Sequence, residues 1–492
     1  MEKIKIFADK NLSIGVVEDK VFGSFLEHLG RAVYTGIYEP GHPGADKNGF
    51  RSDTAALIKE LNVPVIRYPG GNFVSGYNWR DGVGPKNLRP RRLDLAWRTT
   101  ETNQFGTDEF MKWCGLYGIE PMMAVNLGTG SIAEAQALTE YCNFPAGTQL
   151  SDMRIANGAQ KPYGVKYWCL GNEMDGPWQM GHLSAEDYAK KALEAAKLMR
   201  LTDESIELIA CGSSNIDMPT YPDWDRTVLE YLYDDADYIS MHQYYYGNGS
   251  DADFFASYKR MDDFIRTIKA ACDLVRAKRR SSKLMKISFD EWNVWYQKRV
   301  KLKDWEEAPE ILEDIYSLKD ALVFGGLLNT LINNCDRVKM AALAQLVNVI
   351  APIFTAKGGA AIRQTIFYPF KLASLYGRGR ALTTINTSPC FDSSYGQAKF
   401  LSESVVENRD GSVSVFCVNY SEKPVQAEIE LRSFGALKAT EHKVLSGSDL
   451  DAVNTFAHPD AVKPADIEPA AFKDGVMHVK FPAMSWNMIR LQ

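Results

Sequence analysis

The sequence has no apolar run near the roughly 20 residues that a membrane-spanning helix needs. Its N-terminal segment, MEKIKIFADKNLSIGVVEDK, carries charges throughout and lacks the apolar core of a secretory signal peptide. Both absences argue against a membrane protein and against secretion. We therefore expect a cytoplasmic protein that does not interact with membranes.

The sequence also lacks the patterns of metal and phosphate sites. Its eight cysteines occur singly, without a C-x-x-C pair or a nearby histidine at zinc spacing. Acidic pairs such as Asp262-Asp263 lack the D-x-D-x-D-G pattern of a calcium loop, and the glycines before Asn72 lack the phosphate-loop pattern. We expect reduced, buried packing cysteines, no metal ion and no cofactor.

An excess of basic charge is absent as well. The formal net charge is −6, and lysine and arginine are scattered apart from short clusters such as Arg89-Pro90-Arg91-Arg92. Such clusters are more often solvated helix ends or loops than grooves for a polyanion. We expect no nucleic-acid partner.

From about Val21 to about Asn348 the chain repeats one unit, a short apolar strand followed by a helical stretch. Near-continuous apolar strands must be covered on both faces, which favours a parallel sheet surrounded by helices. Eight strands fit a closed (β/α)8 TIM barrel of the α/β class better than a doubly wound sheet. The candidate strands are Val21–Phe25, Val63–Tyr68, Pro121–Asn126, Lys166–Leu170, Ile206–Cys211, Tyr238–His242, Lys286–Phe289 and Met340–Leu346.

After about Tyr376 the pattern changes to short alternating strands separated by Gly, Ser, Pro and Asp. This pattern predicts a C-terminal β-sandwich of jelly-roll-like form. We place the barrel at residues 17–376 and the β-sandwich at 377–492. Residues 1–16 alternate in the same way and are expected to add a strand to the sandwich.

Polar side chains follow most of the expected barrel strands. A barrel brings the carboxyl ends of its strands to one face, where enzymes with this fold keep their active sites. We therefore predict one convergent polar site at that face. The residues are Glu27, Asn72, Asn126, Asn172, Glu173, His242, Tyr244, Glu291, Gln345 and Asn348.

Two of these residues are glutamates in aromatic surroundings. Glu173 lies in YWCLGNEMDGPWQ beside Trp178, and Glu291 lies in KISFDEWNVWY. Desolvation favours the protonated form of a carboxyl group, which suits an acid, and aromatic faces pack against sugar rings. Glycoside hydrolysis needs one carboxyl group that protonates the leaving oxygen and another that attacks the anomeric carbon or activates water. A single strand-end glutamate is more often a salt-bridged structural residue, but the joint occurrence favours a glycoside hydrolase.

His242, in MHQYYYG, is placed to orient a neighbouring carboxylate or Tyr244. A lone histidine is more often a satisfied structural group than a catalyst. We assign His242 a supporting role.

Several ordered motifs resemble the α-L-arabinofuranosidases of glycoside hydrolase family 51, and the resemblance covers nearly the whole chain. These motifs are FGSFLEHLGRAVYTGIYEP, VIRYPGGNFVSGYNWRDGVGP, NQFGTDEF, KYWCLGNEMDGPWQ, ISFDEWNVWY, APEILEDIYSLKDALVFGG and AQLVNVIAPI.

The resemblance implies a barrel joined to a β-sandwich and a retaining, exo-acting enzyme that acts on arabinose-containing oligosaccharides. It implies that Glu173 is the general acid/base and Glu291 the nucleophile, with carboxyl groups about 5–5.5 Å apart, and that Asn172 donates to the 2-hydroxyl of the sugar. It also suggests a homo-oligomer, often a hexamer in this family. The residues that it assigns to sugar binding or support are Glu27, Asn72, Asn172, His242, Tyr244 and Gln345, with Trp97 and Trp178 shaping the pocket.

Two other interpretations remain open from the sequence. A related retaining barrel enzyme, such as a β-xylosidase or an endoglucanase, would use the same carboxyl pair on a different sugar. A noncatalytic carbohydrate-binding protein on an inherited barrel would be expected to lack one of the two glutamates, and both are present.

Overall fold

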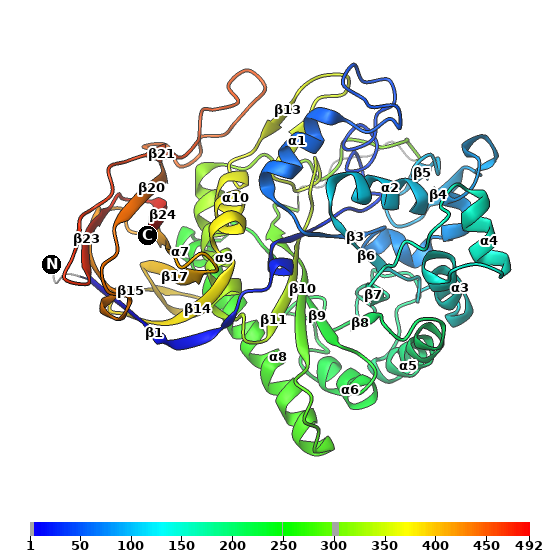
Figure 1. Ribbon diagram of the computed structural model, residues 1–492, viewed down its shortest axis with the longest axis horizontal. Coiled ribbons are helices and arrows are strands. Elements are labelled where there is room, and N and C mark those ends of the chain that lie inside the picture. Colours follow the sequence, from blue (N-terminus) through cyan, green and yellow to red (C-terminus); the bar gives the residue numbers. More distant parts are fainter. Residues whose placement is uncertain (1–3, 248, 298–304) are drawn as a thin grey trace.

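In the computed structural model, which describes residues 4–247, 249–297 and 305–492, a barrel and a C-terminal β domain lie side by side (Figure 1). Eight strands close the barrel in the order β10-β11-β2-β3-β6-β7-β8-β9, and every pairing within it is parallel. The predicted (β/α)8 barrel is therefore confirmed. Its strands are β2 (Gly23–Phe25), β3 (Val65–Tyr68), β6 (Glu120–Ala124), β7 (Tyr167–Leu170), β8 (Glu207–Ala210), β9 (Tyr238–Tyr245), β10 (Lys286–Val294) and β11 (Val338–Leu343).

Strands β9 and β10 extend beyond their predicted ends. They continue to pair past Ser288, with Glu291 opposite His242 and Asn293 opposite Tyr244, after a register shift between Ser288 and Glu291. Such a bulge bends a strand and re-aims its side chains. Tyr244 and Glu291 therefore project from strands, where the sequence predicted positions just after them.

Helices cover the outside of the barrel, and α5 shows why the sequence forms them. The Ser184 side chain accepts a hydrogen bond from the Asp187 N–H and caps the helix start. One face buries Tyr188, Ala192 and Met199 at helical spacing. The helices are α1 (Ser52–Leu61), α2 (Thr107–Tyr117), α3 (Ile132–Asn143), α4 (Gln149–Ala156), α5 (Ala185–Thr202), α6 (Asp223–Leu232), α7 (Asp251–Phe255), α8 (Ser257–Arg279), α9 (Leu318–Asn333) and α10 (Phe367–Tyr376).

Apart from the two large sheets, the described residues form three short hairpins: β4 (Arg92–Asp94) with β5 (Thr99–Glu101), β12 (Ile353–Thr355) with β13 (Ala361–Arg363), and β15 (Cys390–Ser393) with β16 (Gly396–Lys399). Among the described helices, none has the length and apolar character that a bilayer crossing requires. Seven of the eight cysteines are buried, whereas Cys390 is exposed on β15, so the expectation of buried packing cysteines fails at that position.

The C-terminal domain is one ten-stranded sheet in the order β21-β20-β24-β18-β17-β14-β1-β19-β23-β22. Strands near both ends of this order contribute to a single apolar core, so the sheet folds back over itself as a sandwich does. Its strands are β1 (Ile4–Val16), β14 (Gly379–Asn386), β17 (Leu401–Asn408), β18 (Val413–Asn419), β19 (Val425–Glu430), β20 (Ala439–Ser446), β21 (Ala465–Asp466), β22 (Phe472–Lys473), β23 (Val476–Phe481) and β24 (Ser485–Leu491).

Strand β1, which begins the described chain, lies inside the C-terminal sheet, where it pairs antiparallel with β14 and parallel with β19 (Figure 1).

The proposed domain boundary at 376–377 falls between α10 and β14. Helix α9 lies between the barrel and the sheet, and all its residues except Lys319 and Asn333 are buried. A helix that is apolar nearly all round is one that packs on both sides.

Candidate active site

A cavity of about 460 Å³ opens at the carboxyl ends of the barrel strands. Residues that follow β2, β3, β7, β8 and β11 meet there with the last residues of β9 and β10, as the barrel topology requires. Its lining comprises Glu27, Leu29, Gly71, Asn72, Trp97, Glu173, Trp178, Ser214, Asn215, Asp217, Gln243, Tyr244, Tyr246, Glu291, Trp295, Gln297, Leu312, Gln345 and Ile350.

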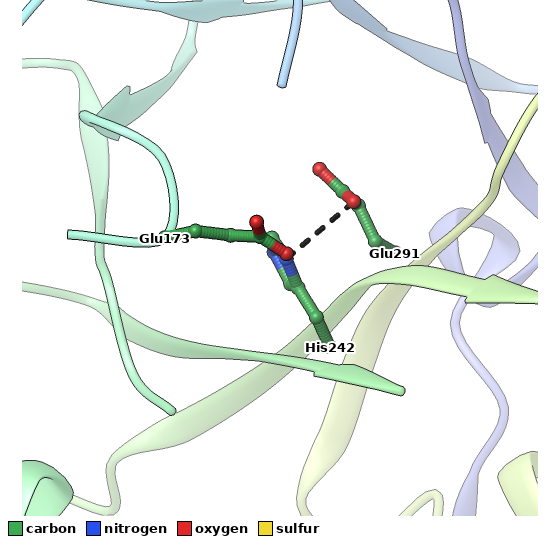
Figure 2. A group of neighbouring side chains, drawn as sticks. All are labelled: Glu173, His242 and Glu291. Carbon is green, nitrogen blue, oxygen red and sulfur yellow. Dashed lines mark hydrogen bonds and ion pairs between the residues drawn. The ribbon is translucent and has the colours of Figure 1, made fainter. Parts of the chain in front are cut away.

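Glu173 and Glu291 extend toward one another across this cavity (Figure 2). One carboxylate oxygen from each lies within 4.8 Å of the other. Glu173 follows β7 and has a φ of 44°, a left-handed conformation that is uncommon outside glycine and costs energy. Trp178, in the same loop, donates from Nε1 to Glu173 Oε2 at 2.7 Å. The turn after β7 therefore aims the Glu173 carboxyl group at the cavity.

Glu291 lies among hydrogen-bond donors. Arg67 Nη1 donates to Glu291 Oε1 at 2.7 Å, and the Tyr244 hydroxyl donates to Glu291 Oε2 at 2.9 Å. Burial raises the pKa of Glu291 above its ordinary value and Glu173 adds to this, while His242 and Arg67 act in the opposite direction. The donors thus stabilise a carboxylate that burial alone would neutralise.

The imidazole ring of His242 is surrounded by three carboxyl groups. Its Nδ1 is 2.9 Å from Glu173 Oε1 and 3.6 Å from Glu291 Oε2, and its Nε2 is 3.1 Å from Asp290 Oδ1. Burial lowers the pKa of His242, but the three carboxyl groups outweigh it and raise this pKa to about 10. An imidazolium donates through both nitrogens, which matches these contacts. Although Glu173, His242 and Glu291 are close enough to share a metal ion, a doubly protonated His242 is not a metal ligand.

The floor of the cavity is polar. Glu27 Oε1 accepts from the Phe73 backbone N–H at 2.9 Å and from Trp97 Nε1 at 3.0 Å. Gln345 accepts from the Glu27 backbone N–H through Oε1 at 3.0 Å. Burial and the charge of Glu291 raise the pKa of Glu27 to about 8, against these hydrogen bonds. A protonated Glu27 can donate one hydrogen bond to a neutral polyol, as well as accept others.

Eight of the ten residues predicted for the site line the cavity, and two lie behind it. Asn172 and His242 are buried outside the cavity lining, and the Asn172 side-chain oxygen accepts from Arg67 Nη2 at 2.7 Å. The residues in the lining are Glu27, Asn72, Trp97, Glu173, Trp178, Tyr244, Glu291 and Gln345.

Two further strand-end residues, Asn126 and Asn348, do not join the site. The Asn126 side-chain oxygen accepts from the Gly128 and Gly130 N–H groups, and Asn348 hydrogen bonds to Thr355. Both side chains hold their own loops, which is a common use of asparagine in turns. Their positions at strand ends did not distinguish this use from ligand binding.

Sequence reasoning did not assign Arg67 or Asp290, although both are buried within 3.5 Å of one another behind the carboxyl pair. The available signal was chemical, since an arginine inside the apolar strand VIRY must be paired if it is buried. A third omission was Asp175, whose Oδ2 accepts from the Ser214 N–H and side-chain hydroxyl at 2.9 and 3.1 Å. This contact ties the loop that carries Glu173 to the loop after β8.

Comparison with known proteins agrees with the geometry. Residues 57–266 match the family description "Alpha-L-arabinofuranosidase 1 domain", and residues 290–485 match "Alpha-L-arabinofuranosidase C-terminal domain". A Bacillus subtilis (strain 168) protein described as an intracellular exo-α-(1→5)-L-arabinofuranosidase is 50% identical and covers 100% of this chain and 99% of its own. A Bifidobacterium longum protein described as an exo-α-(1→6)-L-arabinofuranosidase is 47% identical, over 100% of this chain and 98% of its own.

A solved structure of a family 51 α-L-arabinofuranosidase from Bifidobacterium longum superposes with a TM-score of 0.95. It is 42% identical and covers 99% of each chain. The two family matches span most of the sequence, and the fold and the relatives agree over its full length. The chain therefore belongs to the α-L-arabinofuranosidases of glycoside hydrolase family 51.

Proposed function

We propose that this protein is a retaining, exo-acting α-L-arabinofuranosidase, which removes terminal non-reducing arabinofuranosyl residues from oligosaccharides derived from arabinoxylan or arabinan. The observation that carries the mechanism is the carboxyl pair of Glu173 and Glu291, with oxygens within 4.8 Å of one another. Retaining glycosidases hold their two carboxyl groups about 5–5.5 Å apart, whereas inverting ones leave about 6.5–9.5 Å for a water molecule. The short separation supports direct attack by a carboxylate.

In the first step, Glu291 attacks the anomeric carbon and forms a glycosyl-enzyme ester while Glu173 gives its proton to the departing oxygen. In the second step, Glu173 takes a proton from water, and the water oxygen attacks the same carbon and releases Glu291. Two inversions at one carbon give net retention. The acid has become a base because the first step left it ionised.

The surroundings of the two glutamates support this division of roles. A nucleophile must be ionised, and Glu291 has Arg67, Tyr244 and His242 around its oxygens. Glu173 receives a hydrogen bond from Trp178, which is half exposed at the cavity mouth. Glu173 is thus on the side from which the leaving group departs and water enters.

The buried floor supports removal of a single terminal sugar. Glu27, Gln345 and Glu291 are each at most 5% exposed, so the cavity closes beneath the reacting ring. Such a blind end leaves no room for a chain that continues past the terminal residue. This feature favours an exo-acting enzyme over an endoglucanase, which needs a cleft open at both ends.

The names of the relatives support a proposal for the substrate and the location. The Bacillus subtilis relative is described as intracellular and as acting on α-(1→5) bonds, and a Bifidobacterium longum relative is described for α-(1→6) bonds. We infer that short arabino-oligosaccharides with α-(1→5) bonds are substrates and that the enzyme acts in the cytoplasm. We also retain the expectation of a homo-oligomer, with a hexamer as the form suggested by the family.

The proposal is tested by proton NMR of the first product formed from 4-nitrophenyl α-L-arabinofuranoside. Retention predicts that the α-anomer of arabinose appears first and then mutarotates, and an initial β-anomer would refute the carboxyl assignment. The same preparation is assayed on 4-nitrophenyl β-D-xyloside and on cello-oligosaccharides. Turnover of either of these above that of the arabinofuranoside would favour the alternative enzymes, and sugar binding without turnover would favour a binding protein.

A further inference from the structure

The leaving-group side of the cavity can be located from hydrogen bonds. If Glu173 protonates the leaving oxygen, as the proposed function requires, the leaving sugar lies next to the loop that carries Glu173. Ser214, in the loop after β8, donates to Asp175 in that same loop. Ser213 is fixed in turn by Asp225 on α6, whose Oδ1 accepts from the Ser213 N–H at 2.9 Å. The loop after β8 therefore forms the wall of the mouth beside the leaving group.

Asp217 is the charged group of this wall. Its side chain is 70% exposed, whereas the other carboxyl groups in the described cavity lining, Glu27, Glu173 and Glu291, lie deeper and are largely buried. Trp178 and Tyr246 flank the mouth, and each is half exposed. The mouth thus combines two aromatic rings with one carboxylate, which is a set of groups suited to a sugar that remains in contact with solvent.

An exposed carboxylate binds a neutral ligand well only if it is held in place beforehand. The Asp217 N–H donates to the Asn215 side-chain oxygen at 2.8 Å, and Arg260 on α8 donates from Nη2 to Asp217 Oδ2. In the described part of the chain no hydrogen bond reaches Asp217 Oδ1. One oxygen is fixed by an arginine, and the other is available at the mouth.

The C-terminal domain supports this arrangement from behind. The Arg260 guanidinium lies 4.7 Å from the ring centre of Tyr395, which is in the turn between β15 and β16. Ser394, in the same turn, donates from its backbone N–H to Asp253 Oδ1 on α7 at 2.6 Å. A guanidinium that stacks on a ring loses side-chain freedom before it pairs with a carboxylate. The contact runs from the C-terminal hairpin through α8 to the cavity mouth.

We propose that Asp217 is a specificity-determining residue for the leaving group: its free oxygen accepts hydrogen bonds from hydroxyls of the leaving sugar, and Arg260 and Tyr395 hold it in position. This assignment rests on the proposed function, because it requires a terminal sugar to be split from another sugar. It gives the C-terminal domain a part in substrate choice. In this assignment the terminal arabinofuranosyl ring occupies the buried floor, and Asp217 acts on the leaving sugar at the exposed mouth.

The test compares a leaving group that has hydroxyls with one that has none. For Asp217→Ala, kcat/KM on α-(1→5)-arabinobiose should fall about tenfold, which is the loss of one hydrogen bond to a charged group. On 4-nitrophenyl α-L-arabinofuranoside, kcat/KM should stay within about twofold of the unmodified enzyme, since the nitrophenyl ring of the substrate carries no hydroxyl that could donate to Asp217. Equal losses on both substrates, or no loss on either, would overturn the proposal.

Asp223→Ala is the matched control, because Asp223 is an exposed carboxylate that pairs with Arg226 near the same wall but outside the cavity lining. This variant should leave kcat/KM on both substrates unchanged. For Tyr395→Ala, kcat/KM on arabinobiose should show part of the fall expected for Asp217→Ala, while kcat/KM on the nitrophenyl substrate should not change. An unchanged kcat/KM on arabinobiose would contradict the supporting role of the C-terminal domain. If the unmodified enzyme cleaves neither substrate, the proposed function itself has failed, which is a different outcome from any of these.

Discussion

At the scale of the residue, the two glutamates to which we assign different chemistry have different neighbours. Glu291 is surrounded by an arginine, a tyrosine hydroxyl and a protonated histidine, and these favour the ionised form that a nucleophile needs. Glu173 faces the mouth with Trp178 on one oxygen and His242 on the other. Because both residues are glutamates, the difference between their proposed roles rests on their surroundings.

Substitution of the carboxyl groups should separate the two steps. Glu173→Ala removes the proton donor, so hydrolysis of substrates with poor leaving groups should fall by about 10²–10⁴-fold, while aryl arabinofuranosides lose less in the first step. Azide, which needs no base, should restore turnover of the aryl substrate. Glu291→Ala should abolish turnover both of substrates with poor leaving groups and of aryl arabinofuranosides. Stopped-flow and steady-state rates on the two classes provide the measurement, and uniform loss without azide rescue would contradict the assignment of Glu173.

The charge on His242 should be visible in the pH dependence. His242→Gln removes a positive neighbour that lowers the pKa of Glu291, so that pKa should rise further. Because the proposed nucleophile must be ionised, activity is lost as the pH falls through this pKa, and the acid limb of kcat/KM should move to higher pH. His478→Gln, at an exposed position on β23, is the control and should leave the profile unchanged. An acid limb that does not move would show that His242 carries no charge in the free enzyme.

At the scale of the element, the β4–β5 hairpin brings Trp97 over the cavity and is anchored by a buried carboxylate. Glu101 on β5 accepts from His28 Nδ1 at 2.9 Å, from the Asn103 N–H at 2.6 Å and from the Tyr34 hydroxyl. His28 is the neighbour of Glu27 and stacks on Phe73, with 4.8 Å between ring centres. The hairpin and the floor of the cavity therefore share one network.

Breaking this network should affect both stability and binding. Glu101→Ala leaves the buried His28 Nδ1 and the part-buried Tyr34 hydroxyl without this carboxylate partner. We expect the free energy of unfolding to fall by about 3 kcal/mol and KM to rise as Trp97 loses its support. Glu204→Ala, at an exposed position, should change stability by less than about 0.5 kcal/mol. Melting temperatures and KM for nitrophenyl arabinofuranoside are the measurements. An unchanged KM would mean that Trp97 is held by its bond to Glu27 alone.

At the scale of the whole molecule, helix α9 joins the barrel to the C-terminal sheet through two adjacent glycines. A Cβ added at Gly325 would lie 2.2 Å from Trp486 Cδ1, and one at Gly326 would lie 2.1 Å from the Tyr420 hydroxyl. Glycine lets the aromatic residues of β24 and of the segment after β18 touch the helix backbone. The two domains are thereby packed as one body around α9.

Overpacking at this contact should destabilise the docked domains. Gly325→Ala forces the Trp486 ring to move in a buried interface, which should lower stability by about 1–3 kcal/mol. Gly115→Ala is the matched control, because Gly115 lies inside helix α2 with open space around its added Cβ, and it should be neutral or stabilising by up to about 1 kcal/mol. Differential scanning calorimetry should show a lower transition temperature only for Gly325→Ala. The same change in transition temperature for both variants would mean that helix propensity outweighs the contact with Trp486.

The sequence by itself determined the barrel, the two glutamates that meet in the cavity and most of the cavity lining. Eight apolar runs with intervening helices leave few topologies, and polar residues at strand ends must meet at one face of a barrel. Glu173 and Glu291 were found because both the strand ends and their aromatic neighbours are local features of the chain. Local patterns of this kind need no knowledge of which distant segments meet.

The tertiary structure decided the features that depend on contacts between distant segments. Arg67 meets Glu291 and Asn172 only after the barrel closes. Asn126, which follows a strand like the others, donates to the Tyr77 carbonyl oxygen in the segment after β3. The bulge in β10 and the placement of Tyr395 behind Arg260 also arise from pairing across the fold. Hydrophobic periodicity reports which face of an element is buried, but the partner on that face is set by packing between residues far apart in sequence.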